Sequence, residues 1–241
     1  MLQQTQAARV ADRYPRFLGD FPTVEVLAAA TPAAVMAAWQ GLGYNRRAFR
    51  LQEAARRIAT DGWPAGLEGL EALPGVGPYT AAAVACFALG MGVPALDTNA
   101  RRVLSRWHGR PLSGAALSTA AHQDLPPAAA DWNQAVMDLG AAVCTPRQPA
   151  CDRCPVAAWC TDPSVYEPPR RQGRFEGSLR EARGAVIRHL VSQSSATVEE
   201  IAERSGLPAD RIGGAVDSLR ADRMITATGS DAITLPDGGS A

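Results

Sequence analysis

The chain has 241 residues, 46% of them hydrophobic, which is enough for one full-sized core and a small second domain. Its 24 Lys and Arg balance its 24 Asp and Glu, so any surface that binds nucleic acid has to be local. No stretch approaches the roughly 18 apolar residues of a membrane span, and the first residues lack the basic lead and apolar core of a signal peptide. These features exclude membrane-spanning and secreted proteins and predict a cytoplasmic protein.

Apolar residues recur at helical spacing through the first 160 residues, and alternating strand-like runs are absent, so the fold class is mainly α. Thr31 is expected to cap a helix that carries Pro32 in its first turn. The helices expected in this part of the chain are 2–14, 24–29, 32–40, 45–60, 67–72, 79–90, 98–107, 113–123 and 129–143.

A glycine-rich turn, Leu73-Pro74-Gly75-Val76-Gly77-Pro78-Tyr79-Thr80-Ala81, separates two of these helices. The two glycines allow a tight backbone path, and the N–H groups that begin the second helix can hold a DNA phosphate. Such a contact positions the DNA but carries no sequence information. The turn alone is also compatible with an ordinary helical hairpin. The candidate DNA contacts here are Leu73, Gly75, Val76, Gly77 and Thr80.

Cys144, Cys151, Cys154 and Cys160 form a C-x6-C-x2-C-x5-C pattern at the end of a predicted helix. In a chain without a secretory signal this density indicates metal ligation and not disulfides. Four cysteines are also a common zinc ligand set, so zinc stays open at this point. Cys86 lies in an apolar helical run and is expected to be a small buried hydrophobic residue.

Residues 161–177 are rich in Pro, Gly and Arg without apolar periodicity, which predicts a linker. Beyond it we expect a small domain over 178–241, with helices 178–192, 197–205 and 209–221 and a strand pair within 224–235. This order is typical of a winged helix-turn-helix. Residues 161–241 hold 10 Arg against 12 Asp and Glu, which favours a packing or protein-binding module over a DNA-binding one.

Six segments occur in the order found in MutY-type adenine glycosylases of the endonuclease III superfamily, and residues 1–160 resemble that family. They are MLQQTQ at 1–6, GLGY at 41–44, the glycine-rich turn, DTNARRV at 97–103, NQAVMDLG at 133–140 and the cysteine loop. The resemblance implies a helix-hairpin-helix glycosylase domain over 1–160 with a 4Fe-4S cluster loop over 144–160. MLQQTQ and GLGY favour the adenine branch over the endonuclease III branch.

The resemblance implies hydrolysis of the N-glycosidic bond of a flipped adenine mispaired with 8-oxoguanine or guanine in double-stranded DNA. Asp97 is then the carboxylate that stabilises the cationic sugar, and Asn99 helps to hold the site. Tyr79 stands where the bifunctional endonuclease III branch has a Schiff-base Lys. The chain contains no Lys, so a lysine imine cannot form, and a monofunctional, base excision repair enzyme acting as a monomer at the nucleoid is expected.

The same resemblance places Gln3, Gln4 and Tyr44 in the DNA stack or against the lesion pair, although a polar helix end and a half-buried Tyr are the alternative. Asp97 alone is equally compatible with an ordinary helix cap. A local phosphate-binding surface is expected from a set of arginines, several of which are expected to be no more than solvated surface residues. Its members are Arg46, Arg47, Arg50, Arg101, Arg102 and Arg106.

Two departures from the family affect these expectations. The family's general acid is a Glu just before the MLQQT segment, and this chain starts at that Met, so we expect either a start assigned too late or an enzyme of weak activity. Residues 178–241 are too few and too helical for the Nudix-like domain that reads 8-oxoguanine in many relatives. The alternatives are therefore an endonuclease III-like enzyme acting on damaged pyrimidines and a catalytically silent iron–sulfur protein that binds DNA.

Overall fold

The computed structural model describes residues 1–165, 173–228 and 231–236. Its contacts gather in two compact units, which we call unit 1 (Met1–Trp63 with Gln172–Ala241) and unit 2 (Pro64–Arg171). This grouping pairs the C-terminal segment with the first 63 residues, whereas the sequence analysis placed residues 1–160 in one domain. Of the predicted linker 161–177, residues 166–172 lie outside the described residues.

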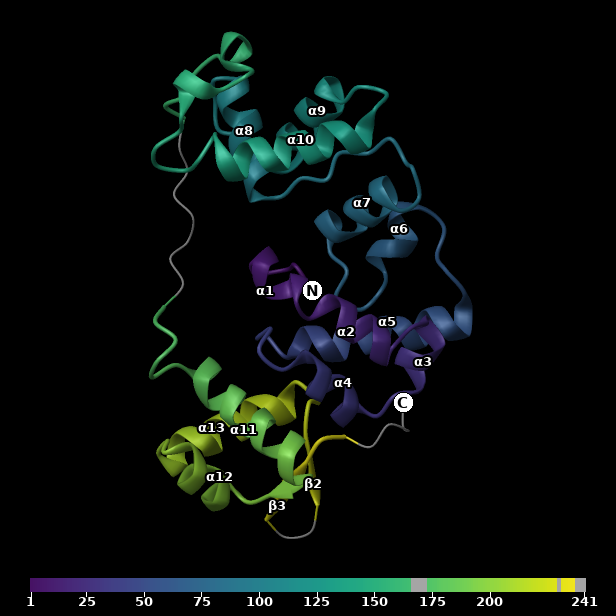
Figure 1. The fold of residues 1–241 in the computed structure, drawn as a ribbon, viewed down its shortest axis with the longest axis vertical. Helices are drawn as coiled ribbons and strands as arrows, with labels where there is room; N and C mark the ends of the chain where they lie inside the picture. Colours follow the sequence, from purple (N-terminus) through teal and green to yellow (C-terminus); the bar gives the residue numbers. More distant parts are fainter. Residues whose placement is uncertain (166–172, 229–230, 237–241) are drawn as a thin grey trace. The chain divides into compact units, whose positions relative to one another are not determined.

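Unit 1 begins with five helices that pack around one hydrophobic core (Figure 1). Thr23 and Thr31 each cap the helix that follows by accepting a hydrogen bond from the N–H three residues on, at 3.3 and 3.2 Å. The expected cap at Thr31 and the proline after it are therefore confirmed. The helices are α1 (Ala7–Ala11), α2 (Tyr14–Asp20), α3 (Val24–Ala29), α4 (Pro32–Trp39) and α5 (Arg46–Asp61).

The N-terminal segment differs from its prediction. The expected single helix over 2–14 is a turn followed by α1, and α2 was not expected. Gln4 has a positive φ of 59°, which no α-helix accommodates, and Pro15 lies in the first turn of α2, where proline is tolerated. The sequence has helical periodicity here, but the left-handed backbone at Gln4 and the proline at position 15 prevent a single continuous helix.

The C-terminal part of unit 1 has the helix, helix, turn, helix, hairpin order expected of a winged helix (Figure 1). A short strand that was not expected joins the hairpin, giving an antiparallel sheet of order β1-β3-β2 with Ser195 opposite Thr234. We call this part the C-terminal module. Its elements are α11 (Leu179–Gln193), β1 (Ser195–Ala196), α12 (Val198–Ser205), α13 (Ala209–Ala221), β2 (Thr226–Thr228) and β3 (Ala232–Thr234).

The C-terminal module shares its core with the N-terminal helices. Val186 and Ile187 of α11 are fully buried, and they belong to the same cluster as Met36 and Trp39 of α4. Burial of side chains of this size is worth roughly 1.5 to 3 kcal/mol each, so α11 is held firmly against α4. Any surface formed by both helices is therefore a feature of one folded unit.

Unit 2 consists of helices with three smaller apolar clusters (Figure 1). Asp97 caps α8 and the helix bounds match the prediction over 98–107. The elements are α6 (Gly66–Glu71), α7 (Pro78–Phe87), α8 (Thr98–Trp107), α9 (Gly114–Asp124), α10 (Ala129–Ala142) and two 3-10 turns, Cys151–Arg153 and Ala157–Trp159. Among the described residues, no helix is both long and apolar enough to cross a bilayer.

Candidate active site and iron–sulfur loop

The glycine-rich turn joins α6 to α7 as a tight hairpin. Gly75 has a φ of +77°, a conformation that side-chain-bearing residues rarely adopt, and the Val76 N–H closes the turn on the Leu73 carbonyl at 3.1 Å. The Leu73 and Val76 side chains pack into the hairpin's own cluster beside Leu70. DNA contact at these positions would therefore come from the backbone, next to the N-terminus of α7.

Asp97 sits in unit 2 at the N-terminus of α8, where both of its oxygens are occupied. One accepts a hydrogen bond from the Ala100 N–H at 2.7 Å, and the other accepts one from the Asn99 side-chain amide at 3.0 Å. The helix cap that was the alternative interpretation of Asp97 is thus present. It does not compete with a catalytic role, because capping fixes the direction of the carboxylate.

Arg102 fixes the direction of the Asn99 amide. Its guanidinium donates to the Asn99 side-chain oxygen at 2.9 Å, which turns the Asn99 nitrogen toward Asp97. The same guanidinium donates to the carbonyls of Gly140 and Cys144, at 2.6 and 2.8 Å. One arginine therefore connects the Asp97 site to the start of the cysteine loop.

Helix α10 packs against α8 and holds the backbone that precedes Asp97. The buried Asn133 side chain accepts from the Ala95 N–H at 2.7 Å and donates to the Val93 and Ala129 carbonyls, both at 2.9 Å. It thereby holds the backbone that leads into Asp97. A Cβ on Gly140 would lie 2.7 Å from the Cβ of Asn99, so only glycine permits this approach of α10 to α8.

Tyr79 lies in the first turn of α7, and its hydroxyl is 3.9 Å from the sulfur of Met137. Burial raises the pKa of Tyr79, and the negative charge of Asp97 raises it further. The phenol is therefore neutral at physiological pH and can donate a hydrogen bond. The electrostatic interaction with Asp97 places the two predicted site residues in one neighbourhood.

The four cysteines line one cavity of about 80 Å³, together with Arg106, Trp107 and Leu139. Burial raises the pKa of Cys160, and the nearby Cys144, Cys151 and Cys154 raise it further. Within the part of the chain that the structure describes, no three Cys, His, Asp or Glu lie close enough to hold a single metal ion. Four cysteine thiolates are a ligand set that iron–sulfur clusters use.

Arg106 organises the cysteine loop from the inside. Its side chain is 2% exposed, and it donates to the Cys144 sulfur at 3.1 Å and to the carbonyls of Thr145, Pro146 and Val165 at 2.9, 3.1 and 2.9 Å. The prediction that Arg106 belongs to a phosphate-binding surface is therefore wrong. Arg102 likewise makes its bonds within the protein, as described above.

In unit 1, Arg47 joins the N-terminal turn, which carries Gln3 and Gln4, to the GLGY turn, which carries Tyr44. Arg47 donates to the carbonyls of Met1 and Gln3 on one side and to those of Leu42 and Gly43 on the other, the last two at 3.1 Å. Burial lowers the pKa of Arg47, and its guanidinium lies 5.8 Å from the Tyr44 ring. The expectation of Arg47 as a phosphate contact is thus replaced by a structural role that joins the N-terminal turn to the GLGY turn.

Gln4 and Tyr44, on these two joined turns, have positive φ values of 59° and 49°. Residues other than glycine are seldom held in this conformation, which costs on the order of 1 kcal/mol or more, and such strain is commonly found at functional sites. Tyr44 is 39% exposed, so its ring is presented to the solvent. The geometry suits a contact with a bound partner.

The predicted residues thus form two groups. Gln3, Gln4, Tyr44 and Arg46 lie in unit 1, and those of the hairpin, Tyr79, Asp97, Asn99, Arg101 and the four cysteines lie in unit 2. Asn133, Arg102 and Arg106 had no structural role assigned from the sequence. Their signal was weak, because a polar residue within an apolar stretch of helix looks the same in the sequence whether it is solvated or directed inward.

Two family models match the chain. Residues 1–118 match the HhH-GPD superfamily of base excision DNA repair proteins, and residues 144–160 match the iron–sulfur binding domain of endonuclease III. The second match covers the four cysteines and confirms the predicted iron–sulfur loop.

Curated relatives and solved structures agree with these matches. The adenine DNA glycosylase of Mycobacterium tuberculosis is 41% identical over 98% of this chain and 83% of its own length. The human adenine DNA glycosylase is 38% identical over 86% of this chain and 37% of its own length. A thermostable thymine-DNA glycosylase superposes with a TM-score of 0.63 at 31% identity, covering 66% of this chain and 78% of the other. The chain therefore belongs to the adenine DNA glycosylase family of helix-hairpin-helix base excision repair proteins.

Proposed function

We propose that this chain is a monofunctional adenine DNA glycosylase that hydrolyses the N-glycosidic bond of adenine mispaired with 8-oxoguanine or guanine. The observation that carries the proposal is the 41% identity to an adenine DNA glycosylase over nearly the whole chain. Tyr79 and the GLGY turn favour this reading over the endonuclease III-like alternative.

The residues divide the work in a physically consistent way. The N-terminus of α7 after the Gly75 turn holds a DNA phosphate, and Gln4 and Tyr44 contact the base stack. Once the adenine is flipped out, its departure leaves positive charge on the sugar, which the Asp97 carboxylate stabilises. Asn99, oriented by Arg102, keeps that carboxylate in place.

Adenine release should be separable from strand cleavage. The full-length gene product, in excess over a duplex with an adenine opposite 8-oxoguanine, is expected to release adenine and to leave an intact abasic strand that breaks only after hot alkali. The chain has no Lys, so borohydride should trap no lysine-linked adduct. Electrophoresis with and without alkali gives both answers.

A duplex with an oxidised pyrimidine serves as the control substrate. Release from that duplex alone would favour the endonuclease III-like alternative. Binding to both duplexes without release of any base would favour the catalytically silent protein. Strand breakage coupled to adenine release, without added alkali, would contradict the monofunctional assignment.

The cysteine loop is proposed to hold a 4Fe-4S cluster through Cys144, Cys151, Cys154 and Cys160. When bound, the cluster supplies a covalent link among four points of this loop, and no step of base release passes through it. Arg106 provides an N–H to the Cys144 sulfur and secures the loop beside α8.

Protein purified without oxygen is expected to be brown, with about four iron atoms per chain and a broad absorbance near 400 nm. Cys154→Ser should lose most of this iron, because it removes one ligand. Cys86→Ser is the matched control, since Cys86 is buried in another place and lines no part of this cavity. Colourless wild-type protein with one zinc per chain would refute the assignment.

A further inference from the structure

Unit 1 contains a second cavity of about 730 Å³, formed by the GLGY turn on one side and by α11 of the C-terminal module on the other. Among the described residues, seven arginines and no Asp or Glu line it. The arginines are Arg9, Arg46, Arg47, Arg50, Arg180, Arg183 and Arg188. The volume lies within the range typical of ligand sites, so the cavity is large enough for a nucleotide.

Only part of this positive charge is used inside the protein. Arg46 and Arg183 both pair with Asp222, at 3.1 and 2.7 Å. The side chains of Arg9, Arg50 and Arg188 are exposed and form no direct ion pair with a described residue, although the Glu181 carboxylate interacts electrostatically with Arg188. The cavity therefore presents an excess of positive charge, which favours an anionic ligand.

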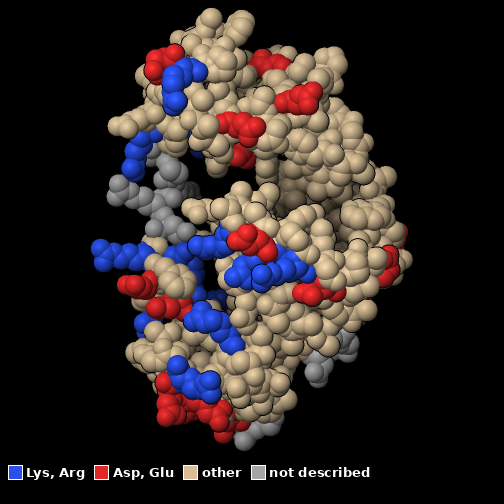
Figure 2. Space-filling model, in the orientation of Figure 1, with Lys and Arg blue, Asp and Glu red and all other residues tan. Residues whose placement is uncertain are grey.

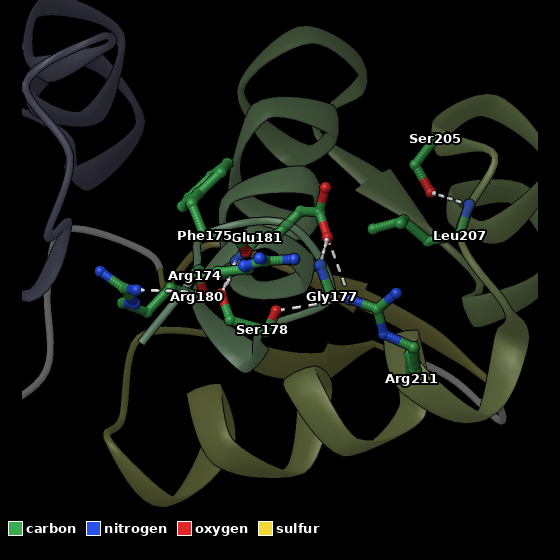
Figure 3. A network of polar contacts seen from close by, with 9 residues as sticks. All are labelled: Arg174, Phe175, Gly177, Ser178, Arg180, Glu181, Ser205, Leu207 and Arg211. Carbon is green, nitrogen blue, oxygen red and sulfur yellow. Dashed lines mark hydrogen bonds and ion pairs between the residues drawn. The ribbon is translucent and has the colours of Figure 1, made fainter. Parts of the chain in front are cut away.

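A network of hydrogen bonds and one ion pair surrounds the start of α11 (Figure 3). Ser178 caps the helix, and Glu181 accepts from the Gly177 N–H at 2.8 Å and from Arg211 at 3.0 Å. Arg180 donates back to the Gly173 carbonyl at 2.7 Å. This network fixes the backbone of Phe175, whose ring is 53% exposed and lines the cavity.

The opposite side of the C-terminal module has the opposite charge. The exposed charged residues of α12 and α13 are Glu199, Glu200, Glu203, Arg204, Asp210, Asp217 and Arg220, a clear acidic excess. In Figure 2, acidic side chains gather over α12, while basic ones gather nearer α11. In a DNA-binding winged helix the third helix enters the major groove, but here α13 has no basic excess to attract phosphates, since Asp210 and Asp217 balance Arg211 and Arg220.

We propose that the C-terminal module binds DNA through α11 and not through α13. Arg188, with Arg50 across the cavity, holds the phosphate of a nucleotide beside the GLGY turn, and the Phe175 ring stacks on its base. The proposal rests on the proposed function for the identity of the DNA. It adds a DNA-binding surface on α11, which the small negative net charge of the C-terminal part of the chain does not reveal.

Two features favour a nucleotide within DNA over a small anion. Two exposed aromatic rings, Tyr44 and Phe175, line the cavity, and an inorganic phosphate has no surface that would stack on them. The cavity also includes Gln4 and Tyr44, the strained residues placed against the base stack above. Guanidinium groups beside aromatic rings are the usual means of holding phosphate and base together.

The test is the salt dependence of binding to a duplex with an adenine opposite 8-oxoguanine. Each lost phosphate contact lowers the slope of log K against log salt by roughly 0.9. Arg188→Gln should lower the slope by about that amount, and Arg50→Gln with Arg188→Gln by about twice as much. Phe175→Ala should weaken binding by about 10-fold and leave the slope unchanged, because stacking releases no counterion.

Arg204→Gln and Arg220→Gln are the matched controls, since both remove an exposed Arg of the same module outside the cavity. Their slopes and affinities should equal those of the wild type. Equal slopes for Arg188→Gln and the controls would overturn the proposal, as would a larger loss at Arg220 than at Arg188. A titration with deoxyguanosine monophosphate tests the other source of a nucleotide. The proposal would also be overturned if the wild type bound this nucleotide saturably and Arg188→Gln abolished that binding without changing the binding of DNA.

Adenine release by the wild type and the two control variants separates this proposal from the proposed function. At saturating protein, Arg204→Gln and Arg220→Gln should release adenine at the wild-type rate, because both residues lie outside the cavity. Altered slopes with no adenine release by the wild type would reject the glycosylase and keep the DNA surface. Adenine release by the wild type, with unchanged salt slopes for the cavity variants, would support the glycosylase and reject the DNA surface.

Discussion

Asp97→Asn is expected to weaken binding to DNA that carries a cationic pyrrolidine in place of the target sugar by about 10-fold to 100-fold, or roughly 1.4 to 2.7 kcal/mol. The substitution keeps the size of the side chain and removes the charge that would face the sugar cation. Asn is as good an N-cap as Asp, so α8 should stay intact. The measurement is a pair of dissociation constants and needs no catalysis.

A neutral tetrahydrofuran at the same position is the control, and its affinity should be unchanged or slightly higher, because a charge that repels phosphate has been removed. In single turnover, adenine release by Asp97→Asn should fall by at least about 10²-fold. Equal weakening for the two sugar analogues would indicate a distorted site. Unchanged binding to the cation, with full activity, would return Asp97 to the role of a helix cap.

Arg106→Met should destabilise unit 2 by about 3 to 5 kcal/mol and release its iron. The Arg106 side chain is 2% exposed, and its loss leaves the partly buried carbonyls of Thr145, Pro146 and Val165 without their donor. Met fills a similar volume, so the effect reports the lost hydrogen bonds more than an empty space. Thermal unfolding and iron content measure the two outcomes.

Arg110→Met is the control for Arg106→Met, because Arg110 is exposed at the next turn of the chain and has no ion pair with a described residue. It should shift the unfolding temperature little and retain the iron. A stable Arg106→Met protein with full iron content would show that the loop is organised by its cysteines alone.

The helices were largely predictable because their ends are local. Thr31 with Pro32, Asp97 and Ser178 begin helices through bonds that span three residues, which periodicity and capping rules detect. The turn before α1 was missed because its shape depends on Arg47, more than 40 residues away in the sequence. A helical pattern cannot reveal such a bond.

The residues of the site itself were predictable from the sequence, but the arginines that hold them in place were not. The order of the segments identified Asp97, Tyr79 and the cysteines, but Arg102 and Arg106 belong to one helix with Arg101, and all three look like a basic face. Only the packing of α8 on α10 and the cysteine loop turns two of them inward. The grouping of α11 with α4 was missed for the same reason, since it depends on contacts between distant parts of the chain.

The left-handed backbone at Gln4 and Tyr44 limits how this protein can be made more robust. Glycine at either position would relax the turn, so a selection for heat resistance alone would tend to accept it. The side chains that would be lost are the ones that we propose contact the DNA. Thermostability screens of this enzyme should therefore also select for retained DNA binding. Glycine suits the backbone at these two positions best, but it has no side chain that could contact DNA.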